Sequence, residues 1–261
     1  MSPSVQSHLE KKEFASELKF LLDPARAELV RVWAREQLVA DPNAGGPTTG
    51  DTYAITSLYF DNTALDVFHR RHRMHLSKYR VRRYGGPDGP VFLERKLKAR
   101  GRLAKRRFPV TAEEIALVAA PVVPEAWAGR WFHTRVVARR LRPICEISYD
   151  RLARVLLTAA GPIRLTMDTR LRARSTAGLA FQDDGSGLPL ASDQVVLELK
   201  YRRELPVLFR ELVARFQLSP QPFSKYRTAV TALELAATPA DRPNATATHT
   251  PDFPAPLTAY A

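Results

Sequence analysis

The sequence is poor in cysteine and in long apolar runs. Cys145 is the one cysteine among 261 residues, which excludes an internal disulfide and fits a reducing compartment. No apolar run reaches the roughly 18 residues that a membrane helix needs. Segment 1–12 is polar and lacks the apolar core of a signal peptide. We therefore expect a cytoplasmic protein.

The motifs that usually mark a nucleotide or phosphate site are also missing. The chain has no Gly-x-x-x-x-Gly-Lys loop and no Gly-x-Gly-x-x-Gly at a strand–helix junction. Ser57, Ser148 and Ser224 lack the context of a nucleophile elbow. Phosphoryl transfer nevertheless needs little covalent chemistry from a protein, because cations, a metal ion and alignment of the reactants are sufficient. A site built from Lys, Arg and Glu would be chemically adequate.

Positive charge is what the chain has in excess. It contains 40 Lys and Arg against 27 Asp and Glu, which gives a formal charge of +13 and a pI near 10.2. Such an imbalance favours a polyanionic partner, which can be nucleic acid, an acidic membrane or polyphosphate. Composition alone does not choose among these three.

The pattern of apolar residues predicts an α+β domain at 13–236, built on an antiparallel sheet or barrel. The flanking segments are expected to be a flexible N-terminus at 1–12 and a disordered Ala/Thr/Pro-rich tail at 237–261. Strands are predicted at 13–22, 53–60, 78–84, 91–97, 104–110, 145–151, 155–159, 163–173 and 194–202. Helices are predicted at 24–39, 63–71, 126–141, 205–216 and 228–236, with one more opened by a capping box at 111–114.

Cations recur at alternate positions in several predicted strands. Because a strand sends alternate side chains to opposite faces, each such segment places a row of positive groups on one side. One alternative is a set of solvated outer faces. Like charges on neighbouring strands repel, however, and several rows together favour a basic cavity that binds a triphosphate or polyphosphate. The rows are Lys78/Arg80/Arg82, Lys96/Lys98, Lys105/Arg107 and Arg164 through Arg172.

Three glutamates precede a lysine by two positions within these strands. A carboxylate beside cations can hold a divalent metal that bridges phosphate oxygens, or it can form a cross-strand ion pair. The pairs are Glu17/Lys19, Glu94/Lys96 and Glu198/Lys200. The metal role is favoured most for Glu198, and the ion-pair alternative is ahead for Glu17 and Glu94.

Several short segments spread over residues 13–235 together indicate a protein family. They are Glu17-Leu18-Lys19-Phe20, Ser57-Leu58-Tyr59-Phe60-Asp61-Asn62, Lys78-Tyr79-Arg80-Val81-Arg82-Arg83-Tyr84, Phe92-Leu93-Glu94-Arg95-Lys96, Lys105-Arg106-Arg107-Phe108, Tyr149-Asp150-Arg151, Met167-Asp168-Thr169, Leu197-Glu198-Leu199-Lys200 and Phe223-Ser224-Lys225-Tyr226. In this order they resemble the VTC domain of polyphosphate polymerases, a branch of the triphosphate tunnel metalloenzymes.

That resemblance implies a closed antiparallel β-barrel tunnel with helices packed outside. Together with the cation rows, it implies three groups of site residues. The expected catalytic residues are Arg80, Arg82, Lys96 and Lys225. The expected phosphate-binding residues are Lys19, Lys78, Lys98, Lys105, Arg107, Arg151, Arg164 and Lys200. The expected ligands of Mn²⁺ or Mg²⁺ are Glu198, Glu94 and Glu17.

The resemblance further implies ATP-dependent synthesis of inorganic polyphosphate. Hydrolytic relatives open with two alternate glutamates before a lysine, whereas this chain has only Glu17 before Lys19, which favours the polymerase branch. A tunnel triphosphatase and a non-catalytic module that binds polyphosphate or RNA are the alternatives. ATP and polyphosphate are the expected partners, and nucleic acid is less favoured. Coupled export would require a separate membrane protein, which could hold the domain at the inner face of the membrane.

Overall fold

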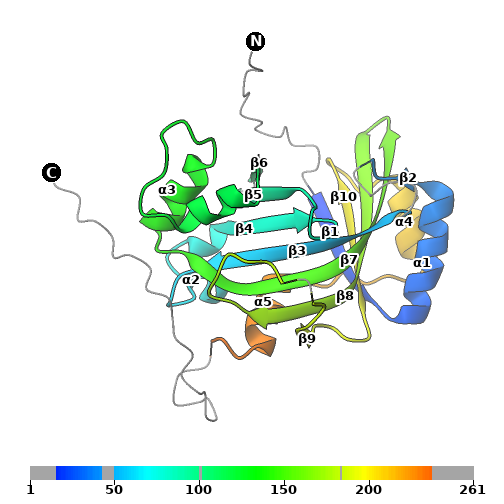
Figure 1. Ribbon diagram of the computed structural model, residues 1–261. Helices are drawn as coiled ribbons and strands as arrows, with labels where there is room; N and C mark the ends of the chain where they lie inside the picture. The colour runs from blue at the N-terminus through cyan, green and yellow to red at the C-terminus, as the bar shows by residue number, and fades with distance from the viewer. Residues whose placement is uncertain (1–15, 43–49, 100–101, 183, 237–261) are drawn as a thin grey trace.

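The computed structural model describes residues 16–42, 50–99, 102–182 and 184–236 (Figure 1). The expected flexible N-terminus at 1–12 and tail at 237–261 lie outside these ranges. One antiparallel sheet forms the centre, with the strand order β1-β10-β8-β7-β3-β4-β5-β6. Its strands are β1 (Ser16–Leu22), β3 (Thr52–Asp61), β4 (Ser77–Tyr84), β5 (Val91–Ala99), β6 (Arg102–Val110), β7 (Arg142–Thr158), β8 (Gly161–Ser175) and β10 (Val195–Tyr201). Two short strands, β2 (Val39–Ala40) and β9 (Leu188–Pro189), pair with β7 and β8.

The helices form three groups around this sheet (Figure 1). One group is α1 (Pro24–Gln37) with α4 (Val207–Arg215), and a second is α2 (Asp66–His69) with α5 (Lys225–Ala232). The third is α3 (Arg130–Ala138) with the 3-10 helix η2 (Glu113–Ala119), and a short 3-10 turn, η1 (Met74–Leu76), precedes β4.

The expected helix starts at Asp23 and Thr111 are confirmed. The Asp23 carboxylate accepts a hydrogen bond from the Arg26 N–H at 2.8 Å, and Pro24 fills the first turn of α1. The Thr111 hydroxyl accepts from the Glu114 N–H while the Glu114 carboxylate accepts from the Thr111 N–H, which is the capping box. The helix that follows is nevertheless the 3-10 helix η2.

Each group of helices forms its own apolar cluster with the sheet. The α1/α4 and α3/η2 groups pack against the outer face, whereas α2 and α5 pack against the inner face, where Tyr59 and Tyr226 of their cluster also line the cavity described below. Phe20, Leu165 and Leu197 meet α1 and α4. Ile55, Ile147 and other apolar residues of β3 and β7 meet α2 and α5. Leu58, Val81, Leu93 and their neighbours meet α3 and η2. Where the apolar residues of a strand pack on the outer face, as in β4 and β10, the alternate polar residues are left for the inner face.

The predicted alternation in β4 is confirmed. Tyr79 and Val81 belong to the outer cluster, and Arg83 stacks at 4.6 Å over the ring of Phe181. The Lys78/Arg80/Arg82 row therefore points to the inner face. The same register carries across the sheet, because Arg80 lies opposite Glu94 of β5, which in turn lies opposite Arg107 of β6.

Two sequence-based expectations need correction, and a third is not shown by the structure. The segments 145–151 and 155–159 form one continuous strand, β7. The row from Arg164 to Arg172 is broken, because Arg170 adopts a left-handed backbone (φ 52°) beside a bulge, and Arg170 and Arg172 are exposed. Among the described strands, β1 and β6 lie at the two ends of the order and do not pair with each other, so closure into the expected barrel is not shown. None of the helices described has the length and apolar character of a membrane span.

A buried carboxylate ties α1 to two strands, far from the inner face. Asp51 is 7% exposed and accepts hydrogen bonds from Arg35 of α1 at 3.1 Å and Arg154 of β7 at 2.9 Å. Burial opposes its ionisation, but the two guanidinium groups outweigh it and lower the pKa of Asp51 from 3.8 to about 2. Asp51 therefore stabilises the fold only in its ionised form.

We expect Asp51→Asn to lower the free energy of unfolding at pH 7 by about 1 to 2 kcal/mol, because the hydrogen bonds lose their charge. Since the folded-state pKa is depressed, this contribution is present above 3.8 and is lost as the pH falls toward 2. Denaturant unfolding across this pH range measures it. Asp88→Asn, at an exposed loop residue, is the control, and a difference between wild type and Asp51→Asn that stays constant with pH would contradict the assignment.

Candidate functional site

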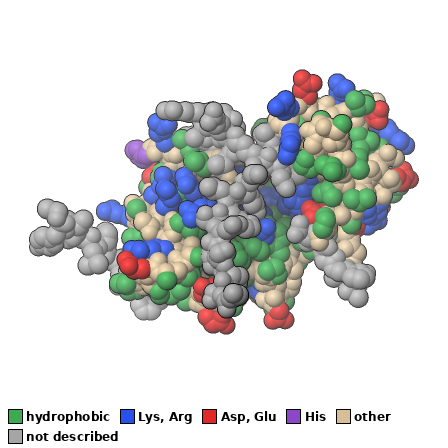
Figure 2. All heavy atoms as spheres, turned by 90° about the horizontal axis from the view of Figure 1, so that it is seen from above, with side chains coloured by type: hydrophobic (Ala, Val, Ile, Leu, Met, Phe, Trp, Pro, Cys, Tyr) green, Lys and Arg blue, Asp and Glu red, His purple; other side chains and the backbone are tan. Residues whose placement is uncertain are grey.

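The inner face of the sheet encloses a cavity of about 640 Å³. Seen from above, Lys and Arg side chains gather in the hollow between the two halves of the molecule (Figure 2). Cations far outnumber carboxylates in the lining, which includes Lys19, Arg70, Lys78, Arg80, Arg82, Arg95, Lys96, Lys105, Arg151, Lys200, Lys225 and Arg227 against Glu17, Glu94 and Glu198. Such a surplus of positive charge attracts a polyanion.

The cavity brings together most of the predicted site residues. All four predicted catalytic residues line it, as do five of the predicted phosphate-binding residues and the three glutamates. Arg107 is not part of the lining, although it shares the face of Glu94, lies 3.5 Å from it and stacks its guanidinium on Phe92. Arg164 is outside the lining, where it pairs with Asp41 at 2.8 Å. The side chain of Lys98 lies outside the described part of the structure.

Glu94 is the counter-ion for one half of the cation rows. Its side chain is 2% exposed and lies 2.5 Å from Arg80, 3.9 Å from Arg82 and 3.5 Å from both Lys105 and Arg107. Burial opposes ionisation, but Arg80 and Arg82 outweigh it and hold the pKa of Glu94 well below its usual range. Both carboxylate oxygens are engaged by cations, so the geometry favours the ion-pair alternative for Glu94.

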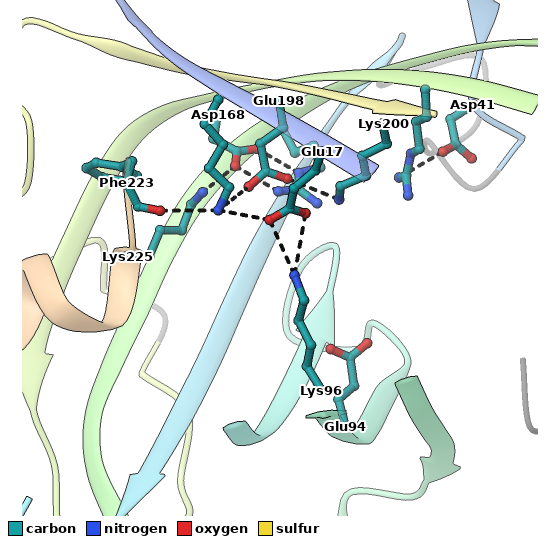
Figure 3. Close-up of polar contacts among 12 residues, drawn as sticks. Glu17, Asp41, Glu94, Lys96, Asp168, Glu198, Lys200, Phe223 and Lys225 are labelled. Carbon is teal, nitrogen blue, oxygen red and sulfur yellow. Dashed lines mark hydrogen bonds and ion pairs between the residues drawn. The ribbon is translucent and has the colours of Figure 1, made fainter. Parts of the chain in front are cut away.

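A second carboxylate group lies on β1 and β10, at the opposite wall (Figure 3). Lys19 contacts Glu198 at 3.2 Å and Glu17 at 3.4 Å, and Lys200 contacts Glu198 at 3.0 Å. Burial opposes ionisation of Glu198, but Lys200 and Lys19 outweigh it and keep its pKa well below the usual range. Burial lowers the pKa of Lys200 to about 8 despite the neighbouring Glu198.

One ion pair joins the two walls. Lys96 of β5 reaches Glu17 of β1 at 3.4 Å, although these strands stand near opposite ends of the sheet order (Figure 3). The contact is part-exposed, and such pairs contribute little stability. Within the described residues, side chains rather than a hydrogen-bonded ladder bound the cavity on this side.

Asp168 is a site residue whose role sequence reasoning missed. It is fully buried on β8, accepts two hydrogen bonds from Arg151 at 2.6 and 2.7 Å, and lies 2.5 Å from the Lys225 amine. Burial opposes ionisation, but Arg151 and Lys225 outweigh it and lower the pKa of Asp168. Arg151 and Asp168 are cross-strand partners, a relation that becomes visible only when the register of β7 and β8 is known.

Tyrosines also line the cavity, and these too were missed. Tyr59 accepts a hydrogen bond from Arg80 at 3.2 Å and stacks on Tyr226. Burial alone would raise the pKa of Tyr59, but Arg80, Arg82 and Lys225 outweigh it and lower the value to about 8. The alternation of β3 places Tyr59 beside Arg80, so the register of β3 and β4 is the signal that would have found it.

The residues present fit a divalent cation that binds together with phosphate. No group of three or more His, Cys, Asp or Glu side chains occurs in the described part of the chain, so an all-protein cage is not built there. Mg²⁺ is commonly held by one or two carboxylates plus substrate phosphates. Glu17 and Glu198 share Lys19 on neighbouring strands and supply such a pair of oxygen donors.

Comparison with known proteins agrees with the fold and with the resemblance noted in the sequence. A protein from Bacillus halodurans, described as a candidate adenylate cyclase, superposes with a TM-score of 0.50 at 14% identity, over 80% of this chain and 92% of that one. A Hippeastrum protein, described as a candidate adenylyl cyclase with a dominant triphosphatase activity, gives a TM-score of 0.48 at 14% identity, over 83% and 95%.

At these identities the structural likeness concerns the fold alone. No curated protein matches the chain. The VTC domain family matches residues 14–234, which is nearly all of the described chain and contains every residue discussed in the cavity. The prediction made from the order of the short segments is confirmed, and the chain belongs to the VTC domain family.

Proposed function

We propose that this protein transfers the γ-phosphoryl group of ATP to the end of an inorganic polyphosphate chain. The observation that carries the proposal is the row Lys78/Arg80/Arg82, which faces Lys19, Arg151 and Lys225 across one cavity of about 640 Å³. This volume lies in the range of sites that bind small molecules. Rows of cations around such a space suit a ligand with charge on every phosphate.

In this reaction a terminal phosphate oxygen of the chain attacks the γ-phosphorus, and the β,γ-bridging oxygen leaves with ADP. Arg80 and Arg82 present guanidinium groups that bind phosphate oxygens in pairs and offset the charge that gathers in the transition state. Lys96 and Lys225 act from the two sides of the cavity as point charges. Asp168 and Glu94 hold Arg151 and Arg80 in place before the substrate arrives.

Glu198, with Glu17, would hold a Mn²⁺ or Mg²⁺ ion. Bound there, the ion would neutralise charge on phosphate oxygens. Glu198 is buried and stays ionised between Lys19 and Lys200, so it is ready to accept a cation without a prior proton transfer. Lys19 and Lys200 would then turn toward the phosphates.

Polymer synthesis is favoured over hydrolysis by the composition of β1. This strand presents one glutamate, Glu17, next to Lys19, and both are occupied by contacts within the cavity. We infer that the sheet acts as a tunnel whose open side is bridged by Lys96 and Glu17. A growing chain could leave through it, and export from the cell would need a separate membrane protein as partner.

Two alternatives make different use of the same cavity. A tunnel triphosphatase would direct water to the γ-phosphorus, and the polyanion-binding module would perform no turnover. Tyr79, Tyr84 and Tyr201 do not stand free on the surface for base stacking, because Tyr79 and Tyr201 are buried and Tyr84 is packed on Phe92. A nucleic-acid surface is therefore the least favoured.

Purified protein incubated with ATP and Mn²⁺ should yield ADP and long polyphosphate, resolved by gel sizing. Arg82→Ala should lower this turnover by about 100-fold, because a preorganised donor at the transferring phosphoryl group is lost. Release of orthophosphate without polymer would overturn the polymerase assignment in favour of the triphosphatase.

Arg83→Ala is the matched control for Arg82→Ala. Arg83 lies on the same strand but on the outer face, stacked on Phe181, so its loss should lower the melting temperature and leave turnover by the folded protein unchanged. Equal turnover in the two variants would show that the cavity face is not the reacting face.

Glu198→Gln should abolish turnover but preserve or strengthen metal-free binding of tripolyphosphate, because a negative charge leaves a cationic cavity. Calorimetric titration measures the binding and ADP release measures the turnover. Glu211→Gln, at an exposed residue of α4, is the control. A variant that retains full metal-dependent turnover would rule out the metal role of Glu198.

Tyr59 should report occupancy of the cavity through its ionisation. Its pKa of about 8 depends on Arg80, Arg82 and Lys225, and a bound polyanion offsets their field and returns the pKa toward 10. Adding tripolyphosphate at pH 8 should therefore reduce tyrosinate absorbance, with uptake of protons. The same change in Tyr59→Phe would assign the signal to another tyrosine.

A further inference from the structure

A second group of cations lies on the outer side of the sheet, opposite the face of Glu94. Arg95 of β5 and Arg106 of β6 are cross-strand partners. Arg135 lies on α3, and Arg139, four residues later, caps the C-terminal end of this helix. We call these four residues the outer arginine cluster. In Figure 2 the left half of the molecule, which carries α3 in Figure 1, shows Lys and Arg side chains on its surface.

Three of the four guanidinium groups of this cluster lie against aromatic rings. Arg106 stacks 4.3 Å from the ring centroid of Trp131, and Arg95 and Arg139 lie 5.8 and 5.9 Å from that of Tyr79. Cation–π contacts of this kind orient a guanidinium without neutralising it. The cluster is thus ordered and keeps its charge.

No ion pair with a carboxylate is formed by these four arginines within the described part of the chain. Arg95 donates to the Ser77 hydroxyl at 3.3 Å, and Arg139 lies 3.6 Å from the Met74 sulfur. Burial, followed by repulsion from neighbouring arginines, lowers the pKa of Arg95 and of Arg106. The buried Nε of Arg95 and Nε1 of Trp131 have no hydrogen-bond acceptor. Unneutralised cations and unused donors together point to a missing anion.

We propose that the outer arginine cluster is a second binding site for condensed phosphate, which holds a stretch of a polyphosphate chain outside the cavity. Arg95 connects the two places, because residue 95 is part of the cavity lining while its guanidinium lies on the other face, over Tyr79. The inference rests on the proposed function for the identity of the chain. A chain that leaves the cavity near Arg95 would keep charged partners on the outer surface.

The surroundings of the cluster favour phosphate over the other polyanions. Arg106 already lies over the ring of Trp131, and Tyr79 is buried, so these two rings are poorly placed for stacking with a nucleic-acid base. Membrane-surface helices bury an apolar face, whereas Val137 is the large aliphatic side chain that α3 exposes among the described residues.

The test compares two double variants that remove the same charge. Arg135→Ala/Arg139→Ala alters the cluster, and Arg203→Ala/Arg210→Ala removes two exposed arginines elsewhere. Affinities for long-chain polyphosphate and for tripolyphosphate are measured without ATP or metal. The cluster variant should bind the long chain at least about tenfold more weakly, as expected for lost charge-assisted contacts. Its affinity for tripolyphosphate, which the cavity accommodates, should be unchanged.

Three results would overturn the second site. Unchanged long-chain affinity in the cluster variant would show that the cluster does not bind the chain. An equal loss of long-chain affinity in the Arg203→Ala/Arg210→Ala variant would show that the effect comes from net charge and not from the cluster. Loss of binding to vesicles containing phosphatidylserine, with polyphosphate binding intact, would assign the cluster to a membrane surface. Because no turnover is measured here, failure of ATP-dependent synthesis is detected separately, by the absence of ADP and polymer in the assay with Mn²⁺.

Discussion

Mutual repulsion among the cations on the inner face of the sheet is the constraint that shapes this protein. Like charges on adjacent strands destabilise a sheet unless something offsets them. Three buried carboxylates offset the repulsion locally. Glu94 lies among Arg80, Arg82, Lys105 and Arg107. Glu198 lies between Lys19 and Lys200, and Asp168 lies between Arg151 and Lys225. Each comes from a different strand, β5, β10 or β8, so the counter-charge is distributed around the cavity. The remaining surplus of positive charge is left for a ligand.

The outer face of the same strands carries two of the three apolar clusters. Helices α1 and α4, and α3 with η2, cover it, and these two clusters draw on the residues that alternate with the cations. Replacing a cavity cation therefore leaves the outer packing intact, whereas an outward residue such as Arg83 or Tyr79 is embedded in it. Function and stability are separated by the two-residue period of the strand.

This separation explains what could be predicted from the sequence. Alternation identified the inner cations of β4 and the paired Glu and Lys of β1 and β10, because it depends only on local geometry. It failed at Arg170, where a left-handed backbone beside a bulge breaks the period, and it could not place Arg107 or Arg164 in or out of the lining. The role of Asp168 depends on which residue of β7 lies opposite it, and Tyr59 likewise depends on the register with β4. Register is a property of tertiary pairing, which one strand alone does not encode.

The surplus of charge also links binding to stability. A ligand that binds the folded state alone stabilises it in proportion to the logarithm of its concentration over the dissociation constant. A bound polyanion would also reduce the repulsion among the cavity cations. Lys78 is an example, because burial lowers its pKa and its hydrogen-bond partner is the Ser224 hydroxyl rather than a carboxylate. On the side of the cavity crossed by Lys96 and Glu17, no hydrogen-bonded ladder joins the described strands. The two walls are connected there by side chains that also face the ligand. Phosphate bound between them would replace a weak, part-exposed ion pair with several charge-assisted contacts, and the sheet would reach its most stable form only when occupied.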